Sequence, residues 1–392
     1  MGDVSTRTGR VSRRSVLRWS GTAGMMAVGA VVLDACSPAG TEPGADANGL
    51  VLLPGFTSRV IARATEPVAD TGFTYRGFPD GAATFVDHEV AGGWYLVSNH
   101  EIPGSGGVSS IRFAPDGTIT DAFSICHDTT LNCAGGATPW GTWLTCEEYD
   151  LGRVYECDPT GRTGAIQRDQ LGAFAHEAAA VAPDGRVYLT EDRSDGGFYR
   201  FTPDEPGDLS SGLLEVATGA AAPGPITWVQ VPDVSSSYVL SRQQVPGMIE
   251  FDGGEGIDVL GDQVLFTTKG DRRIWRYDLT TSSVEVHYQA AEQGQGTLDA
   301  VDNLWVDDAS SNVFVAEDGG NMEVVMLRPD NTAVAVARVV GQQGSEITGP
   351  CFSPDGQRLY FSSQRAPVGL LNAPLGVTYE VSGPWDELLG RP

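Results

Sequence analysis

The stretch that decides the fold is residues 177–192, Glu177-Ala-Ala-Ala-Val-Ala-Pro-Asp-Gly-Arg-Val-Tyr-Leu-Thr-Glu191-Asp192. A short apolar segment leads into a Pro-Asp-Gly turn, a second apolar segment follows, and acidic residues stand at both ends. This pattern is typical of a β-hairpin. Because the two strands of a hairpin run antiparallel, we expect Glu177 and Glu191 at the same edge of a sheet.

The same unit recurs along the chain, and its second strands are spaced about 45 to 50 residues apart, which is typical of propeller blades. One longer gap holds an insertion around residues 205–250, and no useful helical periodicity follows residue 50. We therefore predict an all-β, six-bladed β-propeller formed by residues 50–392 as one domain. The other five units run from Asp80 or Asp87 to His100-Glu101, Cys133 to Glu147-Glu148, Glu255 to Lys269, Asp302 to Glu317-Asp318, and Glu346 to Gln364.

A propeller would aim the ends of these units at one axial pocket. So many carboxylates cannot share a pocket without cations or strongly raised pKa values. Acids beside turns are common in any β protein. Here they recur at the corresponding position of successive units, which favours a metal site. The predicted metal ligands are Cys133, Glu177, Glu255, Asp302 and Glu346, with Glu147 or Glu148, Glu191 and Glu317 behind them.

The chemistry of these residues indicates two kinds of metal. Carboxylate oxygens suit Ca²⁺, whereas a thiolate such as that of Cys133 suits a softer transition metal, so a mixed cluster is expected. The alternative for Cys133 is a buried apolar thiol. Lys269 and Arg365 stand at or beside the ends of two units and are either part of the site or solvated surface charges. His100 and His176 are ligands, proton carriers or hydrogen-bonding neighbours of a ligand, and neither is assigned a catalytic role.

The amino terminus predicts export. Ser12-Arg13-Arg14-Ser15-Val16-Leu17 is a twin-arginine signature, and the apolar run that follows it is too short to span a bilayer. Leu33-Asp34-Ala35-Cys36 resembles a lipobox, which predicts a signal peptide over residues 1–35 and a lipid on Cys36. Residues 36–49 are then a tether, and the protein is extracytoplasmic. An ordinary cleaved signal that releases a soluble protein is the alternative.

The charge and cysteine content limit the partners. The formal net charge is −26, which repels nucleic acid and anionic membranes and suits either solubility or cation binding. Contact with the membrane is expected only through the anchor at Cys36. Five cysteines follow Cys36, so at least one thiol is expected to be unpaired, and the pairing of the others is open.

Three motifs together resemble the PhoX-type alkaline phosphatase family. The first runs from Asn132-Cys133-Ala-Gly-Gly-Ala-Thr-Pro-Trp-Gly-Thr-Trp through Leu-Thr-Cys to Glu147-Glu148. The second is His176-Glu177, and the third is Glu346-Ile-Thr-Gly-Pro-Cys-Phe-Ser-Pro-Asp-Gly. The resemblance implies an exported six-bladed propeller with an iron and calcium cluster, in which Cys133, Glu177 and Glu255 bind iron.

The resemblance also implies a metal-dependent phosphomonoesterase that acts on a small organic phosphate ester. The sequence departs from the family at Gly253-Gly254-Glu255-Gly256, where the family has an Arg-Pro-Glu-Trp run, so an arginine that contacts phosphate is expected to be missing. Lys269 and Arg365 are the candidates to contact phosphate in its place. Two alternatives follow. One is a calcium propeller that cleaves another ester, such as a lactone or phytate, and the other is a non-catalytic propeller braced by calcium.

Overall fold

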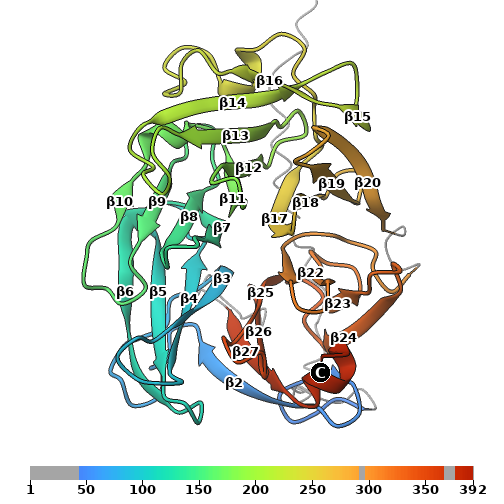
Figure 1. Ribbon diagram of the computed structural model, residues 1–392. Helices are drawn as coiled ribbons and strands as arrows, with labels where there is room; N and C mark the ends of the chain where they lie inside the picture. Colours follow the sequence, from blue (N-terminus) through green and yellow to red (C-terminus); the bar gives the residue numbers. More distant parts are fainter. Residues whose placement is uncertain (1–43, 291–295, 366–375, 392) are drawn as a thin grey trace, which may run out of the picture. The chain divides into compact units, whose positions relative to one another are not determined.

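The computed structural model describes residues 44–290, 296–365 and 376–391. Within this part of the chain the strands form six antiparallel sheets arranged around a central axis (Figure 1). The alternation of apolar strands with Asp-Gly turns in the sequence produces this arrangement, because each turn reverses the chain within one sheet. The predicted all-β, six-bladed β-propeller is confirmed.

Each blade begins with an inner strand, and the following strands step outward. Blade 1 contains β3 (Pro79–Val86), β4 (Trp94–His100), β5 (Gly106–Phe113) and β6 (Ile119–Thr129). Blade 2 contains β7 (Asn132–Ala137), β8 (Trp143–Glu147), β9 (Val154–Cys157) and β10 (Ile166–Gln167). Blade 3 contains β11 (His176–Val181), β12 (Val187–Glu191), β13 (Phe198–Pro203), β14 (Gly212–Thr218) and β16 (Thr227–Gln230).

The remaining blades follow the same plan. Blade 4 contains β17 (Gly254–Leu260), β18 (Gln263–Thr268), β19 (Arg273–Asp278), β20 (Ser283–Gln289) and β15 (Gly224–Pro225). Blade 5 contains β21 (Leu304–Asp307), β22 (Asn312–Ala316), β23 (Glu323–Leu327), β24 (Ala333–Val339) and β1 (Leu50–Leu52). Blade 6 contains β25 (Ile347–Phe352), β26 (Arg358–Ser363), β27 (Val377–Ser382) and β2 (Thr57–Arg63). The short helical segments are η1 (Asp169–Leu171), η2 (Ser241–Gln243) and α1 (Trp385–Leu389).

The first strands of the described chain complete the last two blades. β1 pairs with β24, and β2 pairs with β27 along its whole length. Segments far apart in sequence therefore share one sheet, and the start of the described chain is tied to the last two blades. The predicted insertion around residues 205–250 is also partly built into the sheets, because β14 and β16 extend blade 3 and β15 extends blade 4.

The six inner strands pack closely against one another. Each of β3, β7, β11, β17, β21 and β25 contacts the next in this order, and β25 contacts β3. Small residues allow this approach: a Cβ at Gly136 would overlap the carbonyl oxygen of Ala179, and a Cβ at Gly256 would overlap the backbone of Leu304. The glycines of the inner strands therefore set how near the blades come to the axis.

Aromatic side chains fill the spaces between blades. Between blades 3 and 4, Phe198 stacks on Phe266 with ring centroids 4.4 Å apart, and Trp275 stacks on Phe266 as well. Phe198 is fully buried, and Trp228 covers it from the outer strand β16. This packing fixes each blade against its neighbour, so that the inner strands hold a defined position.

The predicted signal peptide over residues 1–35 and the lipidation site Cys36 lie outside the described residues. The last part of the predicted tether is bound to the propeller, since Asn48 Nδ2 donates to Ser58 Oγ over 2.9 Å and Asp46 accepts the backbone N–H of Leu50. No helix in the described ranges has the length and apolar character needed to cross a bilayer.

Candidate metal centre

Four candidate ligands lie at the beginning of the inner strands, where they are the second residue of the strand: Asp80, Cys133, Glu177 and Glu255. Glu177 follows His176, which pairs with Glu191 at the end of β12, and Cys133 follows Asn132, which pairs with Glu147 at the end of β8. The hairpins therefore bring both of their ends to one edge of the sheet, as the spacing predicts.

A register shift occurs immediately after these pairs in four blades. It lies between Pro79 and Ala82, between Asn132 and Gly135, between His176 and Ala179, and between Gly254 and Ile257. A β-bulge places two residues opposite one and re-aims the side chain at its start. The residues at the start of these irregularities are Asp80, Cys133, Glu177 and Glu255.

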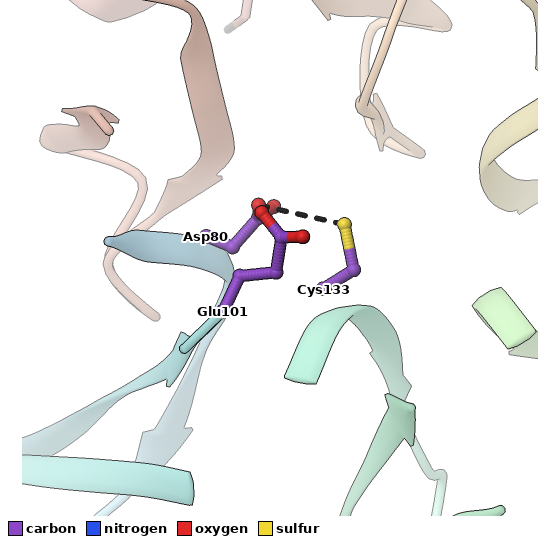
Figure 2. A group of neighbouring side chains, drawn as sticks. All are labelled: Asp80, Glu101 and Cys133. Atoms are coloured by element: carbon purple, nitrogen blue, oxygen red, sulfur yellow. Dashed lines mark hydrogen bonds between the residues drawn. The ribbon is translucent and has the colours of Figure 1, made fainter. Parts of the chain in front are cut away.

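These residues assemble into four overlapping groups, and within each group the potential ligand atoms lie within 4.8 Å of one another. Cys133, Glu177 and Asp302 each belong to two groups, so the groups form one continuous chain of ligands. Figure 2 shows the first group, in which the Cys133 Sγ lies 3.5 Å from Asp80 Oδ2 and Glu101 points to the same place. The four groups are Asp80–Glu101–Cys133, Cys133–Glu148–Glu177, Glu177–Glu255–Asp302 and Asp302–Asp318–Glu346.

Three members of these groups were not among the predicted site residues. They are Asp80, Glu101 and Asp318. The repeat did contain a signal for two of them, because Glu101 stands one residue beyond the end of β4, as Glu148 does beyond β8, and Asp318 stands two residues beyond the end of β22. The structure answers the question of which neighbour faces the groups, since Glu148 belongs to one of them and Glu147 to none.

Glu147, Glu191 and Glu317 were predicted as ligands, and the structure places them elsewhere. Glu147 accepts the backbone N–H groups of Thr130 and Arg153, and Glu317 accepts those of Asp299 and Glu323. None of the three belongs to the four groups. The correction has a simple physical reason: successive side chains at a strand end point in opposite directions, so one of each acidic pair closes the turn.

Glu191 has the same role in blade 3. Its carboxylate accepts the backbone N–H of Gly197 over 3.0 Å and the hydroxyl of Tyr199 over 2.7 Å, and Arg242 Nη1 lies 2.8 Å from its other oxygen. Arg242 comes from the inserted segment and also pairs with Asp150 and with Asp195. Glu191 therefore ties the insertion to the end of blade 3.

His100 and His176 are fully buried beside ligands but belong to none of the groups. His100 contacts Ser109 Oγ through Nε2 over 2.8 Å, and His176 Nε2 lies 3.2 Å from the carbonyl of Gly172. Burial lowers the pKa of each histidine to about 3. Both rings are therefore neutral at pH 7, and their contacts support the strand ends.

Burial and mutual repulsion raise the pKa values of the grouped acids. Burial, followed by repulsion from Glu255 and Glu148, raises the pKa of Glu177 well above its usual range. Burial and neighbouring acids raise the pKa of Glu148 and of Glu346 to about 8. Asp80, Glu255 and Asp302 also have strongly raised pKa values, because burial removes water from their carboxylates.

The donor set fits bound cations. Glu177 is 1 % exposed, and neither of its carboxylate oxygens has a hydrogen-bond partner. Asp80 Oδ1 is likewise buried without a partner. An unpartnered buried carboxylate is costly, and a positive ion at the place where several of them converge removes that cost. Carboxylates together with one thiol suit hard and softer metals respectively.

Two cations lie beside the groups. Lys269 Nζ lies 2.5 Å from Glu255 Oε1 and 2.7 Å from Asp192 Oδ2. Arg365 forms an ion pair with Glu346, and its guanidinium is 3.9 Å from Asp318. Both side chains are about 40 % exposed, so each can contact a ligand that enters from solvent.

An axial cavity of about 700 Å³ lies directly behind the groups. All six inner strands contribute to its wall, and the wall begins one residue after the ligands, at Gly81, Ala134, Ala178 and Gly256. None of the grouped residues lines this cavity, so the cavity and the four groups are separate features of the inner strands.

The comparisons with known proteins point to one family. The family model described as alkaline phosphatase PhoX matches residues 104–154, 149–267 and 263–367. No curated protein sequence matches the chain.

Among solved structures, Pseudomonas fluorescens PhoX in complex with vanadate, a transition state analogue, matches with a TM-score of 0.71 and 19% identity over 87% of this chain and 97% of that one. A structural genomics protein of unknown function from Bacteroides thetaiotaomicron matches with a TM-score of 0.51 and 8% identity, over 83% and 76% of the two chains. Because the family model spans more than half of the sequence and the fold agrees, the chain belongs to the alkaline phosphatase PhoX family.

Proposed function

We propose that this protein is a metal-dependent phosphomonoesterase that hydrolyses small organic phosphate esters and holds iron and calcium in the four groups. Its family is one of phosphoester hydrolases, and its described residues contain acidic groups that could bind metal ions. The observation that carries the proposal is Glu177, whose two buried oxygens have no partner although they belong to two groups at once.

The residues that would hold the metals divide by chemistry. Cys133 joins Asp80 and Glu101 in one group and Glu148 and Glu177 in the next, so an iron ion is proposed there. The groups that contain only carboxylates are proposed to hold calcium; they are Glu177–Glu255–Asp302 and Asp302–Asp318–Glu346. When bound, such ions supply Lewis acidity and neutralise the charge that develops on a phosphoryl group.

The chain's own residues have three tasks in this proposal. Lys269 and Arg365 offer positive charge to a phosphate dianion that approaches the acidic face. Glu147, Glu191 and Glu317 accept backbone N–H groups near the ends of the second strands, which fixes the positions of the candidate ligands beside them. The burial of Glu177 and Glu255 removes water from their carboxylates and strengthens the charge interactions there.

We also infer that the protein acts outside the cytoplasmic membrane and is anchored through Cys36. The support is the twin-arginine signature at Arg13-Arg14 and the lipobox-like run that ends at Cys36. Mass spectrometry of the protein from its native membrane fraction tests this inference. A diacylated amino-terminal Cys36 is expected, and a soluble form cleaved at another residue would contradict it.

The function is tested by metal analysis of protein purified without chelator, together with phosphate release from p-nitrophenyl phosphate. Wild type is expected to hold iron and calcium and to release phosphate, whereas Cys133→Ser loses iron and activity. Cys146→Ala serves as the control, because Cys146 is a fully buried thiol in β8 that belongs to none of the groups. Calcium without iron and without turnover would replace the proposal with a non-catalytic, calcium-braced propeller.

A further inference from the structure

Blade 4 differs from its neighbours at the end of its second strand. Blades 1, 2 and 3 each carry an acid one residue beyond that strand, namely Glu101, Glu148 and Asp192, and in blade 5 Glu317 and Asp318 stand one and two residues beyond it. In blade 4 the same position holds Lys269, the only lysine in the chain. A positive charge therefore stands where blades 1, 2, 3 and 5 have a negative one and blade 6 has the neutral Gln364.

The ammonium group of Lys269 binds two acids from adjacent blades. Its Nζ lies 2.7 Å from Asp192 Oδ2 and 2.5 Å from Glu255 Oε1. Glu255 is 2 % exposed, and it also belongs to the group of Glu177, whose oxygens have no partner. Charges this close and this poorly hydrated interact strongly. Lys269 therefore neutralises a pair of acids that would otherwise need another cation.

Gly253 creates the space that Lys269 occupies. Gly253 has a φ of 70°, which favours glycine, and a Cβ added there would lie 2.9 Å from Lys269 Cγ. The backbone N–H of Lys269 donates to the carbonyl of Gly253 over 2.8 Å. The lysine stem thus packs directly over the bare backbone at residue 253, which brings its ammonium to Glu255.

We propose that Lys269 is a built-in cation that replaces a metal ion between blades 3 and 4. This inference rests on the proposed function, in which the neighbouring groups hold metal ions. Asp192 and Glu255 offer carboxylate oxygens suited to calcium, and the fixed ammonium keeps that ion out. An ammonium has three N–H donors, so after two ion pairs one donor is left for an oxygen of the substrate phosphate.

The test is the number of calcium ions bound per chain, measured by equilibrium dialysis and elemental analysis. Lys269→Gln is expected to bind one calcium ion more than wild type, because Asp192 Oδ2 and Glu255 Oε1, the two oxygens that the ammonium held, are then free to coordinate it. Lys269→Arg keeps the charge and is expected to bind the wild-type number. Arg273→Gln is the control, since Arg273 lies at the same end of blade 4 but pairs with Asp271 outside the groups.

A double variant distinguishes calcium bound by Asp192 and Glu255 from calcium bound because the substitution loosens the site in general. Lys269→Gln combined with Asp192→Asn removes one of the two ligands, so the extra calcium ion is expected to disappear. If wild type binds metal and Lys269→Gln binds the same number of ions, the role of Lys269 is overturned while the proposed function stands. If wild type binds no metal, the proposed function itself fails. Thermal unfolding of each variant shows that it is folded.

Discussion

Glu177→Gln is expected to have opposite effects on the metal-free and the metal-loaded protein. In the metal-free protein Glu177 is a buried carboxylate without a partner, and such a group costs several kcal/mol. A buried amide without partners costs about 1–3 kcal/mol. The substitution should therefore stabilise the metal-free protein by about 2 kcal/mol.

The size of the temperature shift follows from the length of the chain. Unfolding entropy is about 2.1 cal/mol/K per residue, or about 0.7 kcal/mol/K for roughly 350 folded residues. A gain of about 2 kcal/mol then raises Tm by about 3 °C. In the metal-loaded protein the same substitution removes a ligand shared by two groups, so Tm, metal content and phosphatase activity should all fall.

The assay is calorimetry at pH 8 with and without chelator, and Glu191→Gln is the matched control. Glu191 is equally buried, but Gly197, Tyr199 and Arg242 all contact its oxygens. Its substitution should lower stability with or without metal, by about 3–5 kcal/mol for a broken buried ion pair. A Glu177→Gln protein that loses as much stability in chelator as Glu191→Gln would refute the assignment of Glu177 to a cation site.

Three further predictions concern the scaffold. Gly136→Ala should lower the free energy of unfolding by about 3 kcal/mol in denaturant titration, because its methyl group would overlap the carbonyl of Ala179, and an unchanged midpoint would contradict the close packing. Burial raises the pKa of Asp258 to about 7, so its contribution to stability is lost as pH rises through 7. Asp258→Asn should thus gain Tm relative to wild type as pH rises from about 4 to 7 and keep a constant advantage above 7, and a difference that does not change between pH 4 and 7 would count against this. Arg242→Met should cost about 3 kcal/mol by leaving the buried Glu191 unpaired, and protease cleavage of residues 232–250 should accelerate; resistance equal to wild type would show that Arg242 does not anchor the insertion.

The repeat allowed much of the site to be predicted. Apolar segments joined by Asp-Gly turns fixed the hairpins, and hairpins of similar length return both ends to one edge, so Cys133, Glu177, Glu255, Asp302 and Glu346 could be predicted as one cluster. These residues occupy corresponding positions in successive units, and those positions follow from the number of residues in each hairpin. For this reason the prediction did not need the contacts between blades.

The direction of each side chain could not be predicted in the same way. Glu147 and Glu148 are neighbours of identical chemistry, yet Glu147 closes a turn and only Glu148 reaches the groups. The spacing rule selected Glu191 and Glu317 for the same reason, although backbone N–H groups hold both of them. Which acid of a pair faces the axis depends on bulges and on the donors that the next turn supplies.

The sequence by itself determined the all-β class, the six blades and the chemical type of the candidate ligands. The reason is that turn residues and the spacing of the repeat can be recognised in the order of the residues alone. The tertiary structure alone decided which residues converge, because Asp80 and Glu101 come from blade 1 and meet Cys133 only where β7 of blade 2 packs against β3 (Figure 2). It alone also placed Lys269 on acids from two adjacent blades, since an ion pair depends on a distance between blades that the spacing of residues in the chain does not determine.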